Sequence, residues 1–213
     1  MMKLPKRTAS NHLELELLSK GYKNIIGIDE VGRGAFAGPV VVGAFIFTQE
    51  THVIEGVYDS KKITRKKREL ISEIFSTKEK IIKIGSVELI DKIGVGKTVE
   101  KLIQEVVREY SSPETYFLMD GYFSGLPHEN SSQVVKGDSL HYSISCASIL
   151  AKVFRDNLMQ EIGSRYPFYN FQSNAGYGTA MHLEAIKKYG ITPLHRLSFK
   201  PINDIANSAI KLS

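Results

Sequence analysis

Residues 24–47 read NIIGIDEVGRGAFAGPVVVGAFIF, two apolar runs separated by a glycine-rich segment. The first run, residues 24–29, carries three isoleucines and predicts a short buried strand. Residues 32–39 predict a turn, and Val40–Phe47 predicts a second strand with apolar side chains on both faces. This stretch therefore indicates a sheet that is covered on both sides.

Further along the chain, strands are expected at residues 81–89, 115–119 and 133–135. Between the first two, apolar residues recur at helical spacing up to Tyr110, and Thr98 is expected to be the N-cap of this helix. A strand, a helix and a strand in this order indicate a crossover of the α/β kind.

The last part of the chain is expected to be mainly helical. Residues 139–165 predict a long helix, and a shorter helix begins after Thr179 and is closed by Gly190. We therefore expect a sheet domain over residues 1–165 and a small helical C-terminal extension over residues 166–213.

The composition limits the class of protein. The 28 Lys and Arg residues exceed the 23 Asp and Glu residues, and the net charge of +5 favours polyanionic partners without proving one. The single cysteine, Cys146, cannot form an internal disulfide and is expected to be a buried structural thiol rather than a nucleophile. The start of the chain lacks the apolar segment of a secretory signal, and no run reaches the roughly 18 apolar residues of a membrane span. The expected location is the cytoplasm.

Four acidic side chains follow apolar runs of the sequence: Asp29, Glu30, Asp120 and Asp138. Each of them alone is also explained as an acid that faces water in a turn. Together they indicate a metal site, because functional groups of α/β sheets collect at the carboxyl ends of strands, and clustered carboxylates repel one another. Oxygen ligands without a His or Cys cluster favour Mg²⁺ or Mn²⁺ over Zn²⁺.

Residues 94–98, Gly-Val-Gly-Lys-Thr, match the end of a phosphate-binding loop. The full motif requires a glycine at position 91, where this chain has Asp91, so a carboxylate would stand where phosphate should lie. A phosphotransferase that binds a nucleotide here is therefore retained only as an alternative function.

Three further segments are candidates for contacts with phosphates or nucleotides, and each also has an ordinary structural explanation. In the basic run 61–68, Lys61 and Lys62 are the best candidates, although such runs are usually solvated helix faces. Tyr177 lies between two glycines, so its ring is either exposed to a nucleotide or buried in a core. The His-Arg pair at 195–196 either contacts phosphate or makes a structural pairing.

Seven motifs occur in order over about residues 21–202. They are Gly27-Ile28-Asp29-Glu30-Val31-Gly32-Arg33-Gly34, Asp59-Ser60-Lys61, Asp120-Gly121, Lys136-Gly137-Asp138, Ser148-Ile149-Leu150-Ala151-Lys152-Val153, Arg155-Asp156 and Gly176-Tyr177-Gly178-Thr179. The long first string is the most specific of them. In this order and combination, the motifs resemble those of ribonuclease HII.

The resemblance implies an RNase H-like α/β fold, in which helices flank a mixed β-sheet and a small helical region lies at the C-terminus and completes the substrate groove. It implies endonucleolytic cleavage of the RNA strand in RNA/DNA hybrids, and cleavage of DNA duplexes at single embedded ribonucleotides. The expected mechanism uses two divalent ions, Mn²⁺ or Mg²⁺, and the expected products carry 5′-phosphate and 3′-hydroxyl ends.

The resemblance also assigns roles to single residues. The implied catalytic and metal-binding residues are Asp29, Glu30, Asp120 and Asp138. The implied substrate-sensing residues are Gly32, Arg33, Gly34 and Tyr177, to which the basic run adds Lys61. Asp156 matches a recurrent family acid and is expected to have a structural or supporting role. Ala175 stands where the family often has lysine, which would cost a phosphate contact, and Cys146 stands where alanine is common.

A function of another class, a non-catalytic nucleic-acid-binding module, would keep the basic surface and Tyr177 without needing the acids. All four acids are present, which favours the nuclease. The expected ligands are RNA/DNA hybrids and DNA that contains ribonucleotides, bound by a monomer with no membrane partner.

Overall fold

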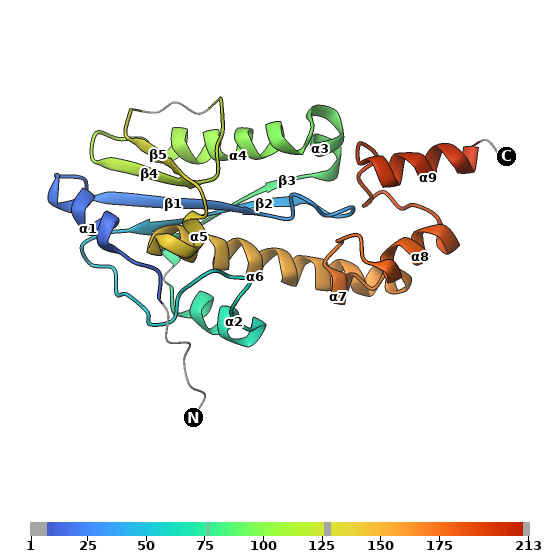
Figure 1. Ribbon diagram of the computed structural model, residues 1–213, viewed down its shortest axis with the longest axis horizontal. Coiled ribbons are helices and arrows are strands. Elements are labelled where there is room, and N and C mark those ends of the chain that lie inside the picture. The colour runs from blue at the N-terminus through green and yellow to red at the C-terminus, as the bar shows by residue number, and fades with distance from the viewer. Residues whose placement is uncertain (1–7, 76, 126–128, 211–213) are drawn as a thin grey trace. The chain divides into compact units, whose positions relative to one another are not determined.

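The computed structural model describes residues 8–75, 77–125 and 129–210, and Figure 1 labels its helices and strands. The strands of this described part form a five-stranded sheet of order β3-β2-β1-β4-β5. They are β1 (Asn24–Val31), β2 (Val40–Phe47), β3 (Lys80–Gly85), β4 (Thr115–Asp120) and β5 (Ser131–Val134). The predicted α/β class, a mixed sheet flanked by helices, is confirmed.

Helices follow β2, β3 and β5, whereas β1 and β4 lead directly into the next strand. The helices of the described part are α1 (His12–Ser19), α2 (Arg65–Ile74), α3 (Val87–Ile93), α4 (Val95–Tyr110), α5 (Gly137–Leu140), α6 (Tyr142–Arg165), α7 (Phe171–Asn174), α8 (Ala180–Tyr189) and α9 (Lys200–Ile210), with short 3-10 helices at Thr77–Glu79 and Pro167–Tyr169. None of the helices in the described ranges has the length and apolarity needed to cross a membrane. Residues 1–7, part of the start in which no secretory signal was expected, lie outside the described residues.

Most of the expected elements are present. β2 has the predicted bounds, β1 and β4 extend one or two residues beyond the predicted strands, and α8 begins after Thr179 and ends before Gly190. The Thr179 side chain accepts a hydrogen bond from the His182 amide at 3.3 Å, as an N-cap residue should. The long helix expected over residues 139–165 is divided by an extended residue, His141, into α5 and α6.

The strand expected over residues 81–89 is wrong in its second half. β3 ends at Gly85, and Ser86 caps α3 by accepting a hydrogen bond from the Leu89 amide at 3.2 Å. A serine that captures a helix amide favours a helix start over continued strand pairing. The apolar residues after it therefore belong to a short helix.

Thr98 is not the N-cap of α4. The helix begins three residues earlier, at Val95, because Gly94 adopts a positive φ of 83° and separates α3 from α4. Thr98 is buried inside α4, and its hydroxyl donates to the Gly94 carbonyl at 2.9 Å. A threonine inside a helix can donate to the carbonyl one turn back, whereas an N-cap threonine accepts from a following amide, so the residue type alone does not distinguish the two positions.

Glycines allow α6 to approach the sheet closely. A Cβ atom on Gly27 of β1 would lie 2.2 Å from the Ser143 backbone, and one on Gly43 of β2 would lie 2.5 Å from the Ala147 carbonyl oxygen. The small residues Ser143, Ala147 and Ala151 of α6 lie at this contact, and Cys146 of the same helix is buried as well. The prediction that Cys146 is a buried structural thiol is confirmed.

The described chain forms two compact units. The first comprises the chain up to Val31, Val42–Lys83 and Glu100–Val153. The second comprises Gly32–Val41, Ile84–Val99 and the chain from Phe154 onward. The predicted division into residues 1–165 and 166–213 stays a prediction.

Each unit has its own apolar core. In the first, side chains of β1, β2 and α6 pack together with the aromatic pair Phe45 and Phe75, whose ring centroids lie 4.7 Å apart. The core of the second unit consists of Ala37, Met159, Tyr169, Phe171, Ala185, Ile186 and Ile202.

Candidate active site

Strand pairing brings Asp29 and Asp120 together. β1 and β4 run parallel, with Ile28 beside Met119, and the two aspartates are the next residues on these strands. Equivalent residues of paired parallel strands point to the same face of the sheet. The two carboxylates therefore leave the sheet side by side at its carboxyl edge.

Asp138 reaches the same place through a tight turn after β5. Lys136 adopts a left-handed conformation with a φ of 60°, and the Gly137 amide donates to the Asp120 Oδ1 at 2.8 Å. A Cβ atom on Gly137 would lie 2.5 Å from the Ile144 Cδ1, so any larger residue here would displace the end of that side chain. The Ser145 hydroxyl then donates to the Asp138 carbonyl at 2.7 Å and fixes the end of the turn.

The result is a compact group of three carboxylates. Asp29, Asp120 and Asp138 each offer an oxygen, and these oxygens all lie within 4.8 Å of one another. Glu30, the fourth predicted acid, is outside this group, since consecutive strand residues point to opposite faces. It is half-buried beside the group and adds to the electrostatic repulsion felt by Asp29.

The group carries unfavourable negative charge. Burial raises the pKa of Asp29 well above its ordinary value, the charges of Glu30 and Asp120 raise it further, and a hydrogen bond from Ser148 opposes them. Burial and the charge of Asp120 likewise raise the pKa of Asp138. A divalent cation would remove this repulsion, and an all-oxygen ligand set suits Mg²⁺ or Mn²⁺.

Two serines in this site had no role assigned from sequence. The Ser148 hydroxyl bonds the Asp29 carboxylate and lies 2.9 Å from the Ser60 hydroxyl, and both serines are buried. Ser60 and Ser148 belong to two different sequence motifs, and their contact joins residues 88 positions apart. A sign of the role of Ser148 in the sequence is its place as a polar residue among the apolar residues of a helix.

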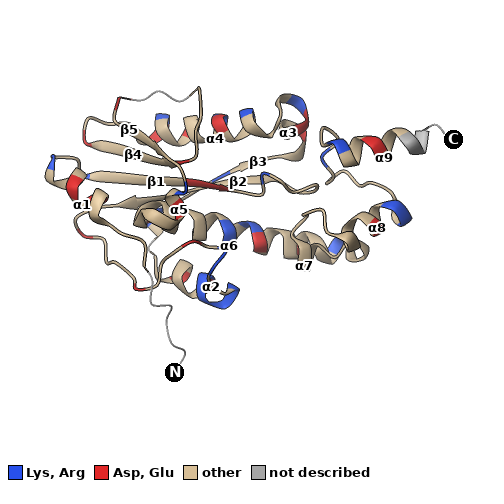
Figure 2. Cartoon of the chain, viewed as in Figure 1, with Lys and Arg blue, Asp and Glu red and all other residues tan. Residues whose placement is uncertain are grey.

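Lys61 lies at the edge of the acidic group, with its ammonium 3.7 Å from the Asp138 Oδ2 and its side chain mostly exposed. Burial alone would lower the pKa of Lys61, but the nearby carboxylates, chiefly that of Asp138, raise it overall. Lys62 instead pairs with Asp59 at 3.1 Å. Figure 2 shows Lys and Arg gathered at the beginning of α2, but Arg68 donates to the carbonyls of Ser60 and Ile63 and so has a structural role.

The predicted substrate-sensing glycines belong to the second unit. They lie in a loop whose backbone carbonyls accept hydrogen bonds from two buried arginines. Arg155 donates to the carbonyls of Pro39 at 2.8 Å, Ala175 at 2.8 Å and Ala37 at 3.2 Å. Arg196 donates to the carbonyls of Gly38 at 2.9 Å and Arg33 at 3.0 Å. We call these two guanidinium groups and the loop of residues 32–39 the arginine-caged loop.

The two glycines around Arg33 have different surroundings. Gly32 is buried with a φ of 93°, and a Cβ atom on it would lie 2.1 Å from the Arg155 Nε. Gly34 is exposed, and a Cβ atom on it would meet nothing within 4 Å. Gly32 is therefore required by the protein itself, whereas no internal contact explains Gly34.

Tyr177 also lies in the second unit, and its side chain is partly exposed at 37%. The Arg155 guanidinium lies 5.6 Å from its ring centroid. The Tyr177 carbonyl accepts hydrogen bonds from the Thr179 amide at 2.8 Å and from the His182 Nδ1 at 2.9 Å. The backbone of Tyr177 is thus fixed by hydrogen bonds, while part of its ring is accessible to solvent.

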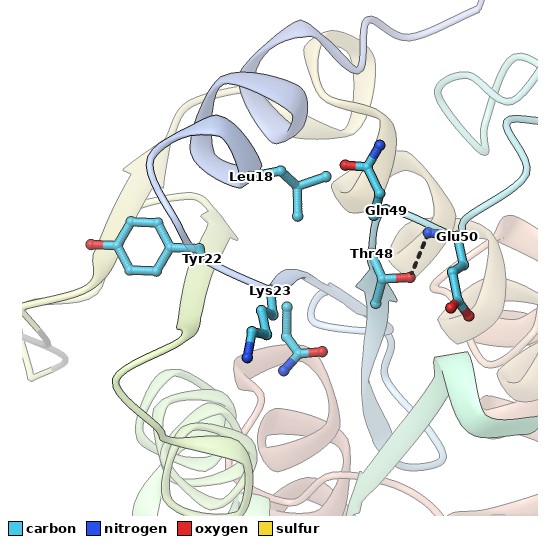
Figure 3. Close-up of a pocket in the computed structure, with 7 residues that line it drawn as sticks. Leu18, Tyr22, Lys23, Thr48, Gln49 and Glu50 are labelled. Atoms are coloured by element: carbon cyan, nitrogen blue, oxygen red, sulfur yellow. Dashed lines mark hydrogen bonds between the residues drawn. The ribbon is translucent and has the colours of Figure 1, made fainter.

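The remaining candidates have structural roles. His195 and Arg196 are buried, so the structural explanation of this pair is confirmed. The phosphate-loop interpretation is wrong: residues 94–98 form a helix junction, and the Asp91 carboxylate accepts hydrogen bonds from the Leu197 and Ser198 amides. A separate open hollow of about 390 Å³ is lined by residues that include Tyr22, Thr48 and Glu50, but it lacks a cluster of acids (Figure 3).

The chain is similar to known proteins in both its sequence and its fold. The family model for ribonuclease HII matches residues 26–202. Ribonuclease HII of Caldicellulosiruptor bescii is 40% identical over 193 residues, which cover 89% of this chain and 93% of that protein.

Solved structures with the same fold were also found. The crystal structure of ribonuclease H2 from Pyrococcus horikoshii superposes with a TM-score of 0.71 at 25% identity, covering 88% of this chain and 99% of that one. The crystal structure of Bst-RNase HIII in complex with Mn²⁺ superposes with a TM-score of 0.63 at 19% identity, covering 92% of this chain and 73% of that one.

Proposed function

Because this chain belongs to the ribonuclease HII family, and is thus a metal-dependent endoribonuclease with ribonuclease H activity, we propose that it cuts both RNA/DNA hybrids and DNA duplexes that contain a single ribonucleotide. The observation that carries this proposal is the group of three carboxylates, Asp29, Asp120 and Asp138, with oxygens within 4.8 Å of one another. Such a group suits divalent cations that hold a phosphodiester.

In the proposed mechanism, Asp29, Asp120 and Asp138 would hold two divalent ions, with Glu30 beside them as a fourth acid. When bound, the ions supply an activated water and stabilise the leaving 3′ oxygen. The Gly137 amide orients the Asp120 carboxylate, and the Ser148 hydroxyl and the Glu30 amide, the latter at 2.7 Å, orient that of Asp29. The products carry 5′-phosphate and 3′-hydroxyl ends.

Recognition of the ribonucleotide is assigned to Gly32, Arg33 and Gly34. Only the 2′-hydroxyl distinguishes RNA from DNA locally, and backbone groups next to an exposed glycine can approach it closely. The open space around Gly34 supports this assignment. Because the loop follows Glu30 by only two residues, an engaged 2′-hydroxyl would align the phosphate with the acids.

Tyr177 is assigned to the neighbouring deoxyribose, on which its partly exposed ring would pack. It would thereby favour a junction between a ribonucleotide and a deoxyribonucleotide. Lys61, at the edge of the acidic group, is assigned a phosphate contact. Through Tyr177, residues 166–213 would contribute to the substrate groove.

The test compares one duplex that contains a single ribonucleotide with its all-DNA twin, in Mg²⁺, in Mn²⁺ and in chelator. We expect cleavage only at the ribonucleotide, only with metal, and with the stated ends. Gly34→Ala should keep the unfolding temperature of the wild type but lose most of this cleavage, because the new methyl group meets only the substrate. Equal cutting of both duplexes by the wild type would contradict the proposed specificity.

A further inference from the structure

We infer that His182 and His195 form a buried hydrogen-bonded pair that positions Tyr177 and is thereby a specificity determinant of the enzyme. The inference rests on the function proposed for Tyr177. Neither histidine reaches the solvent, so both would act through the tyrosine and not by touching the substrate.

The two imidazole rings bond each other, and each bonds one further residue. The His182 Nε2 and the His195 Nε2 lie 3.1 Å apart. The other nitrogen of His182 lies 2.9 Å from the Tyr177 carbonyl oxygen. The other nitrogen of His195 lies 2.9 Å from the Thr192 amide and 2.9 Å from the Thr192 hydroxyl.

These outer partners determine where the protons are. The Tyr177 carbonyl can only accept, so the His182 proton is on Nδ1 and its Nε2 is an acceptor. The Thr192 amide can only donate, so the His195 Nδ1 is an acceptor and its proton is on Nε2. One N–H then lies between the two Nε2 atoms, and the hydrogen bonds run in one direction, from Thr192 through both rings to Tyr177.

A proton added to either ring would break this order. On His182 it would place two N–H groups against each other, and on His195 it would face the Thr192 amide. Both rings are therefore neutral in the folded protein. Burial, together with the repulsion that a protonated His182 would exert, lowers the pKa of His195 to about 4, and burial lowers that of His182.

Aromatic side chains hold the pair in place. The Phe171 ring meets the His182 ring edge-on with centroids 5.2 Å apart, and the Tyr169 ring lies 5.2 Å from that of His195. Because the neighbouring aromatic rings pack against the His182 ring, that ring cannot rotate to donate its Nδ1–H to another acceptor. The direction of its Nδ1–H is thus set by the core of the second unit.

The Tyr177 peptide depends on such an anchor because its neighbours are Gly176 and Gly178, which restrict the backbone little. Its amide donates to the Asn174 carbonyl at 2.9 Å, and its carbonyl accepts from Thr179 and His182. Loss of the His182 donor would leave one bond on the carbonyl. The ring would then shift relative to a sugar packed on it, and small misplacements can cost about a hundredfold in rate.

Two variants of one residue separate the two bonds of His182. In His182→Asn, the amide NH₂ takes the place of Nδ1 and can still donate to Tyr177, but the contact with His195 is lost. In His182→Gln, the longer side chain reaches the place of Nε2 and keeps the contact with His195, but the bond to Tyr177 is lost. His52→Gln, at an exposed histidine, is the matched control.

The measurement is the ratio of kcat/KM for a duplex with a single ribonucleotide to kcat/KM for a uniform RNA/DNA hybrid. We expect His182→Gln to lower this ratio by about tenfold or more, and His182→Asn to stay within about threefold of the wild type. The loss should appear in kcat more than in KM, as for a misplaced reactant. Equal ratios for both His182 variants would overturn the inference.

Tyr177→Ala keeps this result distinct from the proposed function. If Tyr177→Ala leaves the ratio unchanged, the function proposed for Tyr177 is wrong. If it lowers the ratio while His182→Gln does not, the positioning role alone is wrong. If the His182 variants do not fold, ¹⁵N NMR of the wild type decides: one buried histidine protonated on Nδ1 and one on Nε2 supports the pair, and any other combination contradicts it.

Discussion

At the end of β1, oxygens of the three carboxylates Asp29, Asp120 and Asp138 lie within 4.8 Å of one another. The Lys61 ammonium forms an ion pair with this group, 3.7 Å from the Asp138 Oδ2. Around Arg155 and Arg196, by contrast, five backbone carbonyls accept hydrogen bonds from two buried guanidinium groups. Both regions contain buried charged side chains, but only in the second are most of the charged groups hydrogen-bonded to backbone carbonyls of the protein.

The difference separates a binding site from a structural element. The acidic group keeps a repulsion that a cation from solution can relieve, so its charge is available for function. The arginine-caged loop uses its charge to order residues 32–39 without any external ligand. Substitutions in the two regions should therefore affect different measurements.

The largest effect is expected on activity, in the acidic group. Asp29→Asn or Asp120→Asn removes a charged ligand with little change of shape, and cleavage in Mg²⁺ should fall by roughly a thousandfold. Binding of an RNA/DNA hybrid and the circular dichroism spectrum should stay close to those of the wild type. A variant that cleaves at near wild-type rate would remove that aspartate from the metal site.

The next effect is on stability, in the arginine-caged loop. Arg155→Met removes three charge-assisted hydrogen bonds and leaves buried carbonyls without partners, so the free energy of unfolding should fall by about 3–5 kcal/mol. Arg155→Lys keeps the charge but not the planar array of donors, and should recover only part of the loss. Denaturant unfolding measures both, and a Met variant as stable as the wild type would contradict the caging role.

An added methyl group should affect stability differently at the two glycines of the loop, Gly32 and Gly34. In Gly32→Ala the new methyl group would collide with the Arg155 side chain at a residue with a φ of 93°, which should cost about 2 kcal/mol of stability. Gly32→Val should also lose activity. Gly34→Ala should change stability by less than about 0.5 kcal/mol. Equal unfolding temperatures for the two alanine variants would show that Arg155 does not constrain Gly32.

A smaller effect of opposite sign is expected when the acidic group is studied without metal. Like charges about 4 Å apart repel by about 1 kcal/mol even in bulk water, so Asp29→Asn should raise the free energy of unfolding in chelator by roughly that amount. The wild type should regain this difference when Mg²⁺ is added, because the ion binds the folded state. Thermal unfolding with and without Mg²⁺ measures both, and a less stable Asn variant in chelator would argue against net repulsion.

The smallest effect is expected for Lys61. Each phosphate contact releases counterions, so Lys61→Ala should reduce the slope of log affinity against log salt for duplex DNA by somewhat less than one unit. Lys66→Ala, in the exposed first turn of α2, is the matched control. If the two variants have the slope of the wild type, Lys61 is a solvated side chain.

The acidic group could be anticipated from the sequence because it depends on a local pattern. An acid directly after an apolar strand lies at the carboxyl edge of the sheet, whichever strand it pairs with, and this holds for Asp29 and Asp120. The helix start at Val87 was missed because Ser86 and the apolar residues after it fit a strand as well as a capped helix.

The arginine-caged loop could not be anticipated, because each of its parts is ordinary in the sequence. An arginine such as Arg155 usually lies at the surface, and its burial depends on carbonyls more than a hundred residues away at Ala37 and Pro39. The direction of the hydrogen bonds through His182 and His195 likewise depends on Thr192 and Tyr177, which no periodicity connects. Non-local contacts of this kind were visible only in the folded chain.

The pairing of Ile28 with Met119 has a consequence for how the protein folds during its synthesis. These residues are 119 − 28 = 91 positions apart, so the chain must close a long loop before the Asp29 and Asp120 carboxylates can lie side by side. On a ribosome, the first strand would emerge long before its partner. The growing chain would therefore be unable to cleave nucleic acid until β4 and the turn that carries Asp138 had left the ribosome. The order of the strands in the sheet would by itself protect a cell that makes this nuclease from the activity of incomplete chains.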